Sequence, residues 1–329
     1  MSKFNQFEPE KFKELSTQKQ DRQEMSAREM VDLGDLYYFG KDGVTQDYTK
    51  AVEWYTKAAE QGHSQAQNYL GVCYSLGQGV PEDDAQAAAW YIKSAEQGYA
   101  QAQNNAGYCY YLGQGVPKDI EKAVTWFTKA AEQGHAQAQC ILGICYHNGY
   151  SVPIDANKAA EWFMKAAEQG HAKAQFHLAL CYEIGHGIPK DTEKAIAWYT
   201  KSAEQGYVAA QNNLALCYEY GRGIPKDEVM ATVWYMKAAE QGHAKAQYNL
   251  GHCYDDGKGV PMDANQAVEW FMKAAEQDYA KAQYMLGLHY EYGEGVPKDL
   301  EKAAEWFAKA ANQKDDVAKK AAERLLTIL

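Results

Sequence analysis

The sequence predicts an all-α fold, an α/α solenoid in which eight repeats of 36 residues each contribute one pair of helices. Within each repeat, apolar residues recur at the spacing of one helix face, and a glycine-rich loop divides the repeat in two. Each unit of such an array contacts only its neighbours, so a chain of 329 residues can fold without one large core. Tryptophan returns at this period without a break, at Trp54, Trp90, Trp126, Trp162, Trp198, Trp234, Trp270 and Trp306.

The first helix of the type repeat, residues 64–99, is expected over residues 65–76. Ala66, Leu70 and Cys73 fall on one face of this helix and should point into the core. Gly71 costs helix propensity, about 1 kcal/mol relative to alanine. A glycine or alanine recurs at this position, so we expect a neighbouring backbone or ring to lie close to it.

The second helix of the repeat is expected over residues 84–97, after a loop of sequence Gly-Gln-Gly-Val-Pro. Asp83 precedes the helix and is interpreted as its N-cap, and Gly98 closes the helix. Small residues flank the tryptophan, which predicts a bulky ring buried between closely packed helices. The aspartate recurs in every repeat and is assigned to capping rather than to acid–base chemistry: Asp47, Asp119, Asp155, Asp191, Asp227, Asp263 and Asp299.

The repeated pattern A-x-A-Q-x-x-L-G-x-C-Y-x-x-G-x-G-V-P-x-D-x-x-x-A-x-x-W-x-x-K-A-A-E-Q-G-[HY] resembles the Sel-one-like repeat family, a relative of the tetratricopeptide repeats. The resemblance implies antiparallel helix pairs stacked into a right-handed superhelix, used as an adaptor or scaffold. Residues 1–26 are expected to form a leader that covers the first pair, and residues 316–329 a C-terminal capping helix. Ser151 replaces the second loop glycine of the fourth copy, which predicts a local distortion there. The eight copies are placed at 27–63, 64–99, 100–135, 136–171, 172–207, 208–243, 244–279 and 280–315.

Charge and cysteine usage limit the classes of function. The net charge of −11 argues against nucleic acid and against an anionic membrane as partners. The chain shows neither a signal peptide nor an apolar run of about 20 residues, the length that spans a bilayer. A cytoplasmic location is therefore expected. Six of the seven cysteines occupy one repeat position, too far apart for disulfides, which favours a reducing compartment: Cys73, Cys109, Cys145, Cys181, Cys217 and Cys253.

The sequence predicts no catalytic residue, no metal site and no cofactor. Histidines recur at the joint between repeats, but tyrosines replace them in other copies (Tyr99, Tyr207, Tyr279), so a packing or hydrogen-bonding role is favoured over metal binding. Ser16 and Lys19 form one S-x-x-K match, without an S-D-N or K-T-G motif. On this single match, a hydrolase of the β-lactamase or penicillin-binding type is kept as one alternative function. A self-assembling array is another, although the polar tail helix favours a monomer.

The predicted site is the concave groove lined by the first helices. Amides there can bind the backbone of an extended peptide, and tyrosines provide rigid contact area. An acidic row, formed by Glu183, Glu219, Asp255 and Glu291, favours a partner that carries Lys or Arg. The chain is thus expected to be a non-enzymatic scaffold that binds a protein or peptide. The segment of that partner that contacts the acidic row is expected to be basic. The candidate residues are Asn68, Asn104, Tyr108, Tyr111, Phe176, Glu183, Asn212, Glu219, Tyr220, Tyr248, Asp255, Tyr284 and Glu291.

Overall fold

The computed structural model describes residues 25–313 and 317–328, and within them every regular element is a helix. The expectation of an all-α repeat solenoid is confirmed. The chain divides into two compact units, unit 1 (Met1–Ile154) and unit 2 (Asp155–Leu329). The predicted leader lies almost entirely outside the described residues, as do Ser16 and Lys19.

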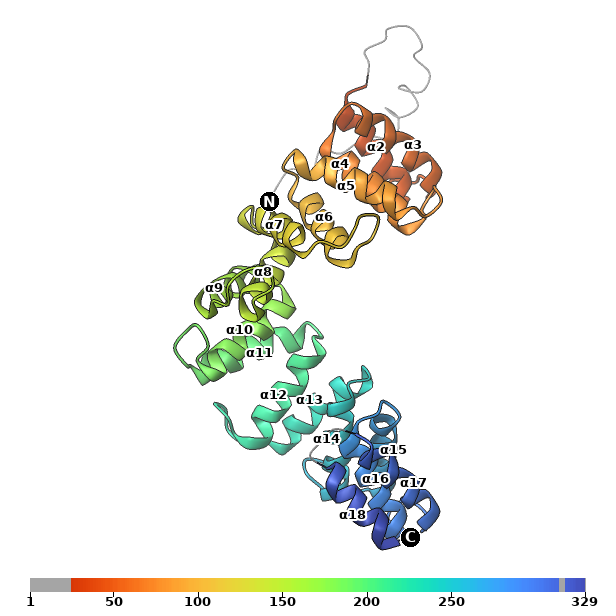
Figure 1. The fold of residues 1–329 in the computed structure, drawn as a ribbon, viewed down its shortest axis with the longest axis vertical. Coiled ribbons are helices and arrows are strands. Elements are labelled where there is room, and N and C mark those ends of the chain that lie inside the picture. Colours follow the sequence, from red (N-terminus) through yellow and green to blue (C-terminus); the bar gives the residue numbers. More distant parts are fainter. Residues whose placement is uncertain (1–24, 314–316, 329) are drawn as a thin grey trace. The chain divides into compact units, whose positions relative to one another are not determined.

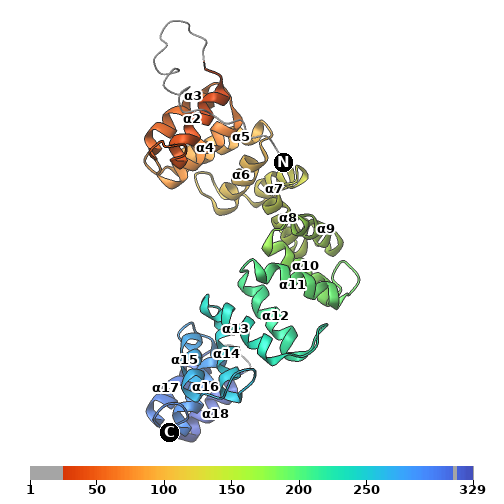
Figure 2. The same ribbon diagram turned by 180° about the vertical axis from the view of Figure 1, so that it is seen from behind.

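Helices of similar length follow one another in both units, and each packs against the next within its unit (Figure 1, with the reverse view in Figure 2). Unit 1 contains α2 (Ala27–Phe39), α3 (Tyr48–Glu60), α4 (Ser64–Leu76), α5 (Asp84–Glu96), α6 (Ala100–Leu112), α7 (Ile120–Glu132) and α8 (Ala136–Asn148). Unit 2 contains α9 (Ala156–Glu168), α10 (Ala172–Ile184), α11 (Thr192–Glu204), α12 (Val208–Tyr220), α13 (Glu228–Glu240), α14 (Ala244–Asp256), α15 (Ala264–Ala275), α16 (Ala280–Tyr292), α17 (Leu300–Ala311) and α18 (Ala318–Ile328).

The recurring aspartates cap the second helices, as predicted. Asp83 accepts the backbone N–H of Gln86 at 3.0 Å, and an aspartate makes the equivalent bond at the start of each of the other seven second helices. These backbone hydrogen bonds hold the pKa values of Asp47, Asp119 and Asp191 below their usual range. Each carboxylate is therefore engaged by a helix end, which is the capping role that the sequence predicts.

The aromatic ring that fills the core is not the tryptophan but the residue after it. Tyr55, Phe127, Phe163, Tyr199, Tyr235, Phe271 and Phe307 are among the largest fully buried side chains, whereas every tryptophan except Trp234 is only partly buried. The prediction of a buried tryptophan knob was wrong for these seven copies. Adjacent positions on a helix point about 100° apart, so where one ring faces the core the other lies toward its edge. In the sixth repeat both Trp234 and Tyr235 are buried. A lysine three residues on lies over each tryptophan, with Nζ between 3.8 and 4.9 Å from the ring centroid.

The glycine within the first helix lies against this core ring. A Cβ on Gly71 would come within 2.7 Å of the Tyr91 ring, and one on Gly251 within 2.6 Å of the Phe271 ring. The expected close approach of a ring is therefore confirmed.

A buried glutamine of the first helix, paired with a glutamine at the end of the second, joins three helices, which the sequence analysis missed. The Gln247 amide nitrogen donates to the Ala239 carbonyl of the preceding repeat at 3.1 Å. The Gln247 oxygen accepts from Gln277 of its own repeat at 2.8 Å. The same pair of bonds recurs in other repeats, at Gln67 and Gln97, Gln103 and Gln133, Gln175 and Gln205, and Gln211 and Gln241.

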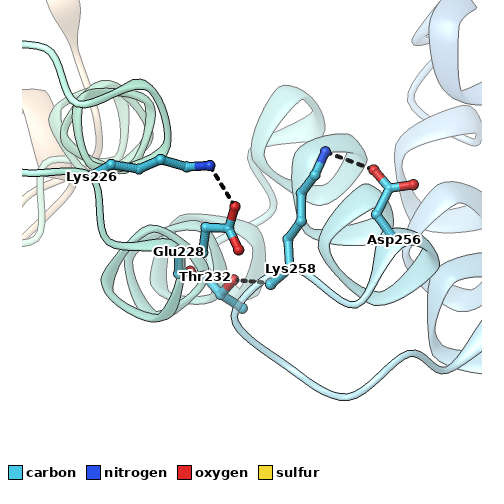
Figure 3. Close-up of polar contacts among 5 residues, drawn as sticks. All are labelled: Lys226, Glu228, Thr232, Asp256 and Lys258. Carbon is cyan, nitrogen blue, oxygen red and sulfur yellow. Dashed lines mark hydrogen bonds and ion pairs between the residues drawn. The ribbon is translucent and has the colours of Figure 1, made fainter.

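The loop inside each repeat rests on the start of the preceding second helix. Thr232 of α13 donates to the Lys258 carbonyl at 2.9 Å, while Lys258 pairs with Asp256 and Lys226 with Glu228 (Figure 3). The next residue, Gly259, has φ 70°, and a Cβ there would lie 2.1 Å from the Glu228 carbonyl oxygen. Ser151 occupies this loop position in the fourth repeat with φ 53°, three residues before the boundary between the units.

Candidate partner-binding face

Helices of the first three repeats line an open cavity of about 420 Å³ in unit 1. Its wall combines five aromatic rings with amide side chains and one valine. Most of these residues belong to the first helices α2, α4 and α6, so the cavity opens on the face where a groove was predicted. The lining residues are Tyr38, Phe39, Tyr55, Asn68, Tyr69, Val72, Tyr99, Gln101 and Asn105.

The amides of the cavity wall form a chain of hydrogen bonds. Gln101 donates to Asn105 at 3.3 Å, and Asn105 donates to the Asn68 oxygen at 2.9 Å. His135 contacts the Gln101 oxygen at 2.9 Å. Asn68 itself is only 2% exposed, whereas Gln101 and Asn105 each use one N–H in these bonds and have a second N–H on the amide group.

Of the four residues predicted for unit 1, the structure places Asn68 in the cavity wall. Tyr108 accepts from Gln137 at 2.8 Å and packs edge-on against Phe127, while Tyr111 is 45% exposed. Asn104 is only 4% exposed. The sequence analysis missed Tyr38, Phe39, Tyr69, Tyr99, Gln101 and Asn105.

Asn104 carries a buried acceptor without a partner among the described residues. At the same repeat position, Asn68 and Asn212 accept from Asn105 and Asn249, but the corresponding residue of the fourth repeat is Ile141.

We expect Asn212→Ala to lower the free energy of unfolding by about 1 kcal/mol more than Asn104→Ala, because only the former removes a satisfied acceptor. The two substitutions delete the same atoms, so their packing costs largely cancel. Urea unfolding of both variants measures the difference, and equal losses would contradict the account.

In unit 2 the four carboxylates of the acidic row each have an internal partner. Tyr199 donates to Glu183 and Tyr235 donates to Glu219, both at 2.5 Å. The other two carboxylates lie near a histidine and an arginine. Asp255 lies 3.6 Å from His289 Nε2, and Glu291 accepts from Arg324 Nε at 2.9 Å.

The partner of each carboxylate follows from the core ring of its repeat. Where that ring is Tyr199 or Tyr235, its hydroxyl reaches the carboxylate, and burial with this bond raises the tyrosine pKa. The last two repeats have Phe271 and Phe307, which carry no hydroxyl. There the partner is His289, which stands where earlier repeats have cysteine, or Arg324 of α18.

The other predicted residues of unit 2 range from buried to exposed. Asn212 is buried, and Phe176 packs on Tyr199 and Tyr207. Tyr248 contacts Phe271 and Tyr279, and Tyr284 contacts Phe307. Tyr220 is mostly exposed, and the charge of Glu219 raises its pKa.

Comparison with known families matches the Sel1 repeat to eight segments: 30–63, 64–99, 100–135, 136–171, 172–207, 208–243, 244–279 and 280–315. The chain belongs to the Sel1 repeat family. Proteins of this family are generally protein-interaction scaffolds.

Two solved structures of Sel1-type proteins are similar over most of this chain. The protective antigen c5321 of uropathogenic Escherichia coli is 37% identical, with a TM-score of 0.83, over 98% of this chain and 67% of that one. A Sel1 repeat protein of Oxalobacter formigenes is also 37% identical, with a TM-score of 0.67, over 91% of this chain and 86% of that one. Among curated proteins, the ERAD-associated E3 ubiquitin-protein ligase component HRD3A of Arabidopsis thaliana is 38% identical over 55 residues. That match covers 17% of this chain and 8% of HRD3A.

The joint histidines of the Sel1 repeats are helix caps. Nδ1 of His63, His135, His171 and His243 accepts the backbone N–H three residues on, at 3.2–3.3 Å. Tyr99, Tyr207 and Tyr279 start their helices without a side-chain bond. No group of three or more potential metal ligands occurs in the part of the chain that the structure describes.

The capping histidines predict a pH dependence of stability. Burial lowers the pKa of His171 and His243 below the ordinary value, so the folded state binds a proton on these residues less readily than the unfolded state. Their contribution is complete above the unfolded pKa of about 6.5 and is lost as the pH falls below it. We expect the melting temperature to fall between pH 7.5 and 5.5.

The matched variant is His171→Tyr combined with His243→Tyr, since tyrosine already occupies this joint in other repeats. Its melting temperature, followed by circular dichroism, should fall less over the same pH range. Parallel pH profiles would contradict the assignment.

All seven cysteines are free and buried. Burial raises the pKa of Cys73 and Cys217 to about 12, and that of Cys109 to about 11. The thiols therefore remain protonated near neutral pH and act as small core residues rather than nucleophiles. No helix among the described residues is long and apolar enough to cross a membrane.

Proposed function

We propose that this Sel1 repeat chain is a non-enzymatic scaffold that holds a peptide or protein segment on the face formed by its first helices. The open cavity of unit 1 is the observation that carries this proposal. Concave sites lined mostly by aromatic and apolar groups, with a few oriented polar groups, are typical of binding sites. The free cysteines favour the cytoplasm as its compartment.

Unit 2 contributes to the same function in a different way. The exposed rings of Tyr220 and Tyr292 offer contact area at the ends of α12 and α16. Beside them, Glu291 uses one oxygen for the bond from Arg324, which leaves the other for a basic group of a partner, whereas Glu219 accepts from both Tyr235 and Tyr220. The candidate residues Phe176, Tyr248, Asp255 and Tyr284 complete the proposed face.

Photo-crosslinking of the full chain tests this proposal. The crosslinking amino acid is placed at Val72 in the cavity or, as the control, at Ala89 on the exposed side of α5. A third variant at Leu216 probes the same repeat position in unit 2. We expect a discrete adduct from position 72 or 216 that is missing from position 89. An adduct formed equally at all three positions would contradict the proposal.

A further inference from the structure

Three successive first helices of unit 1 contain no charged residue. Asp, Glu, Lys and Arg are missing from α4, α6 and α8, although they make up 23% of the whole chain. The first helices of unit 2 differ, since α10, α14 and α16 each carry a lysine and a carboxylate. The paired second helices α5 and α7 are also charged. Within unit 1 the lack of charge is therefore a property of α4, α6 and α8, whereas α2, the first helix of the first repeat, is charged.

The first helices of unit 1 also expose large apolar side chains that packing does not require. Phe39, Leu76 and Leu112 end α2, α4 and α6 and are 50%, 59% and 55% exposed. Of these three residues, Phe39 also lines the cavity. Lys41 lies 4.4 Å from the centroid of Phe39 and places one cation at its edge.

This surface selects against a charged partner segment. A charged side chain that enters the cavity loses its hydration, and α4 and α6 offer no opposite charge in return. The Asp35 carboxylate of α2 already accepts the hydroxyl of Tyr55 in the cavity wall at 2.7 Å. An aromatic side chain buries about 150–250 Å² and contacts the rings of the wall edge-on or stacked. The second N–H groups of Gln101 and Asn105 match a backbone carbonyl of the segment.

We propose that the cavity of unit 1 binds an uncharged peptide segment, with an aromatic or large aliphatic side chain in the cavity and a backbone carbonyl on the amide groups of Gln101 and Asn105. This inference rests on the proposed scaffold function and specifies the partner of its N-terminal face. Because phosphate or carboxylate attraction plays no part, the affinity of the segment is nearly independent of salt.

A random dodecapeptide library displayed on phage, selected on the full chain, tests the inference. Synthetic copies of the enriched peptides are titrated at 50 and 500 mM NaCl. The expected peptides share an uncharged window with one aromatic or large aliphatic residue, and their Kd changes less than about twofold with salt. Replacing that residue with aspartate, or Val72 with arginine, weakens binding at least about tenfold.

Leu216→Arg is the matched control, since Leu216 holds the position of Val72 in a repeat of unit 2 and is likewise partly buried. It should change Kd less than about twofold, and melting curves check that both variants stay folded. Enrichment of basic peptides whose binding weakens with salt and depends on Leu216 would overturn the inference but leave the scaffold function standing. Peptides that bind both variants as tightly as the wild-type chain, or no enrichment over an empty support, would contradict both the inference and the scaffold function.

Discussion

Phe271→Ala lowers the free energy of unfolding by about 3–5 kcal/mol, whereas Trp270→Ala on the preceding residue lowers it by about 1–2 kcal/mol. The Phe271 ring is fully buried, with Tyr248, His252 and His289 around it. Trp270 is partly exposed and stacks under Lys273, whose Nζ lies 3.8 Å from its ring centroid. Removing the phenylalanine leaves a cavity in the core, while water can fill the space of the tryptophan.

Urea unfolding of the two variants under identical conditions measures the difference. Repeat stability is approximately a sum over neighbours, so Phe271→Ala should weaken the contacts of α15 with both α14 and α16. Equal losses for both variants, or a larger loss for Trp270→Ala, would indicate that the tryptophan is a core residue and would contradict the packing described above.

Glu219→Lys lowers the free energy of unfolding by about 2–4 kcal/mol. The substitution removes the acceptor of the buried Tyr235 hydroxyl, a bond of 2.5 Å, and brings an ammonium group into a partly buried site. Glu219→Gln keeps an acceptor for the hydroxyl and should cost about 1 kcal/mol. In urea unfolding we therefore expect Glu219→Lys to lose more free energy of unfolding than Glu219→Gln.

Glu240→Lys is the control, because Glu240 ends α13 on its exposed side and the reversal adds the same charge. It should change stability by less than about 0.5 kcal/mol. A loss at Glu240 as large as that at Glu219 would mean that net charge, and not the tyrosine bond, sets the effect. A role of the acidic row in binding is therefore tested with Glu→Gln variants, which spare the core.

The sequence alone was sufficient for the helices and their caps, since these depend on local patterns such as Asp83 and Gly98. It could not distinguish Trp54 from Tyr55 as the core ring, because the apolar stripe of the second helix contains both. The helix rotation that decides between them comes from packing against the first helix, where Gly71 leaves room for Tyr91.

The sequence does contain a signal for the internal partners of the acidic row, namely a fixed separation between each carboxylate and its tyrosine. Glu183 precedes Tyr199 by 16 residues, as Glu219 precedes Tyr235, and Ser75 contacts Tyr91 across the same separation. Repeats with phenylalanine lack this polar pairing. The cavity was incompletely predicted for another reason. The predicted groove residues all lie in the second and later copies, so Tyr38 and Phe39 of the first copy were left out.

The central claim is that the first helices of unit 1 form the partner-binding face. The most direct measurement uses the partner that is captured by crosslinking from position 72 and then purified. Its affinity is measured for the wild-type chain, for Val72→Arg and for Ala89→Arg. The account predicts a Kd at least about tenfold weaker for Val72→Arg and within about twofold of wild type for Ala89→Arg. Equal affinities for all three proteins would contradict it.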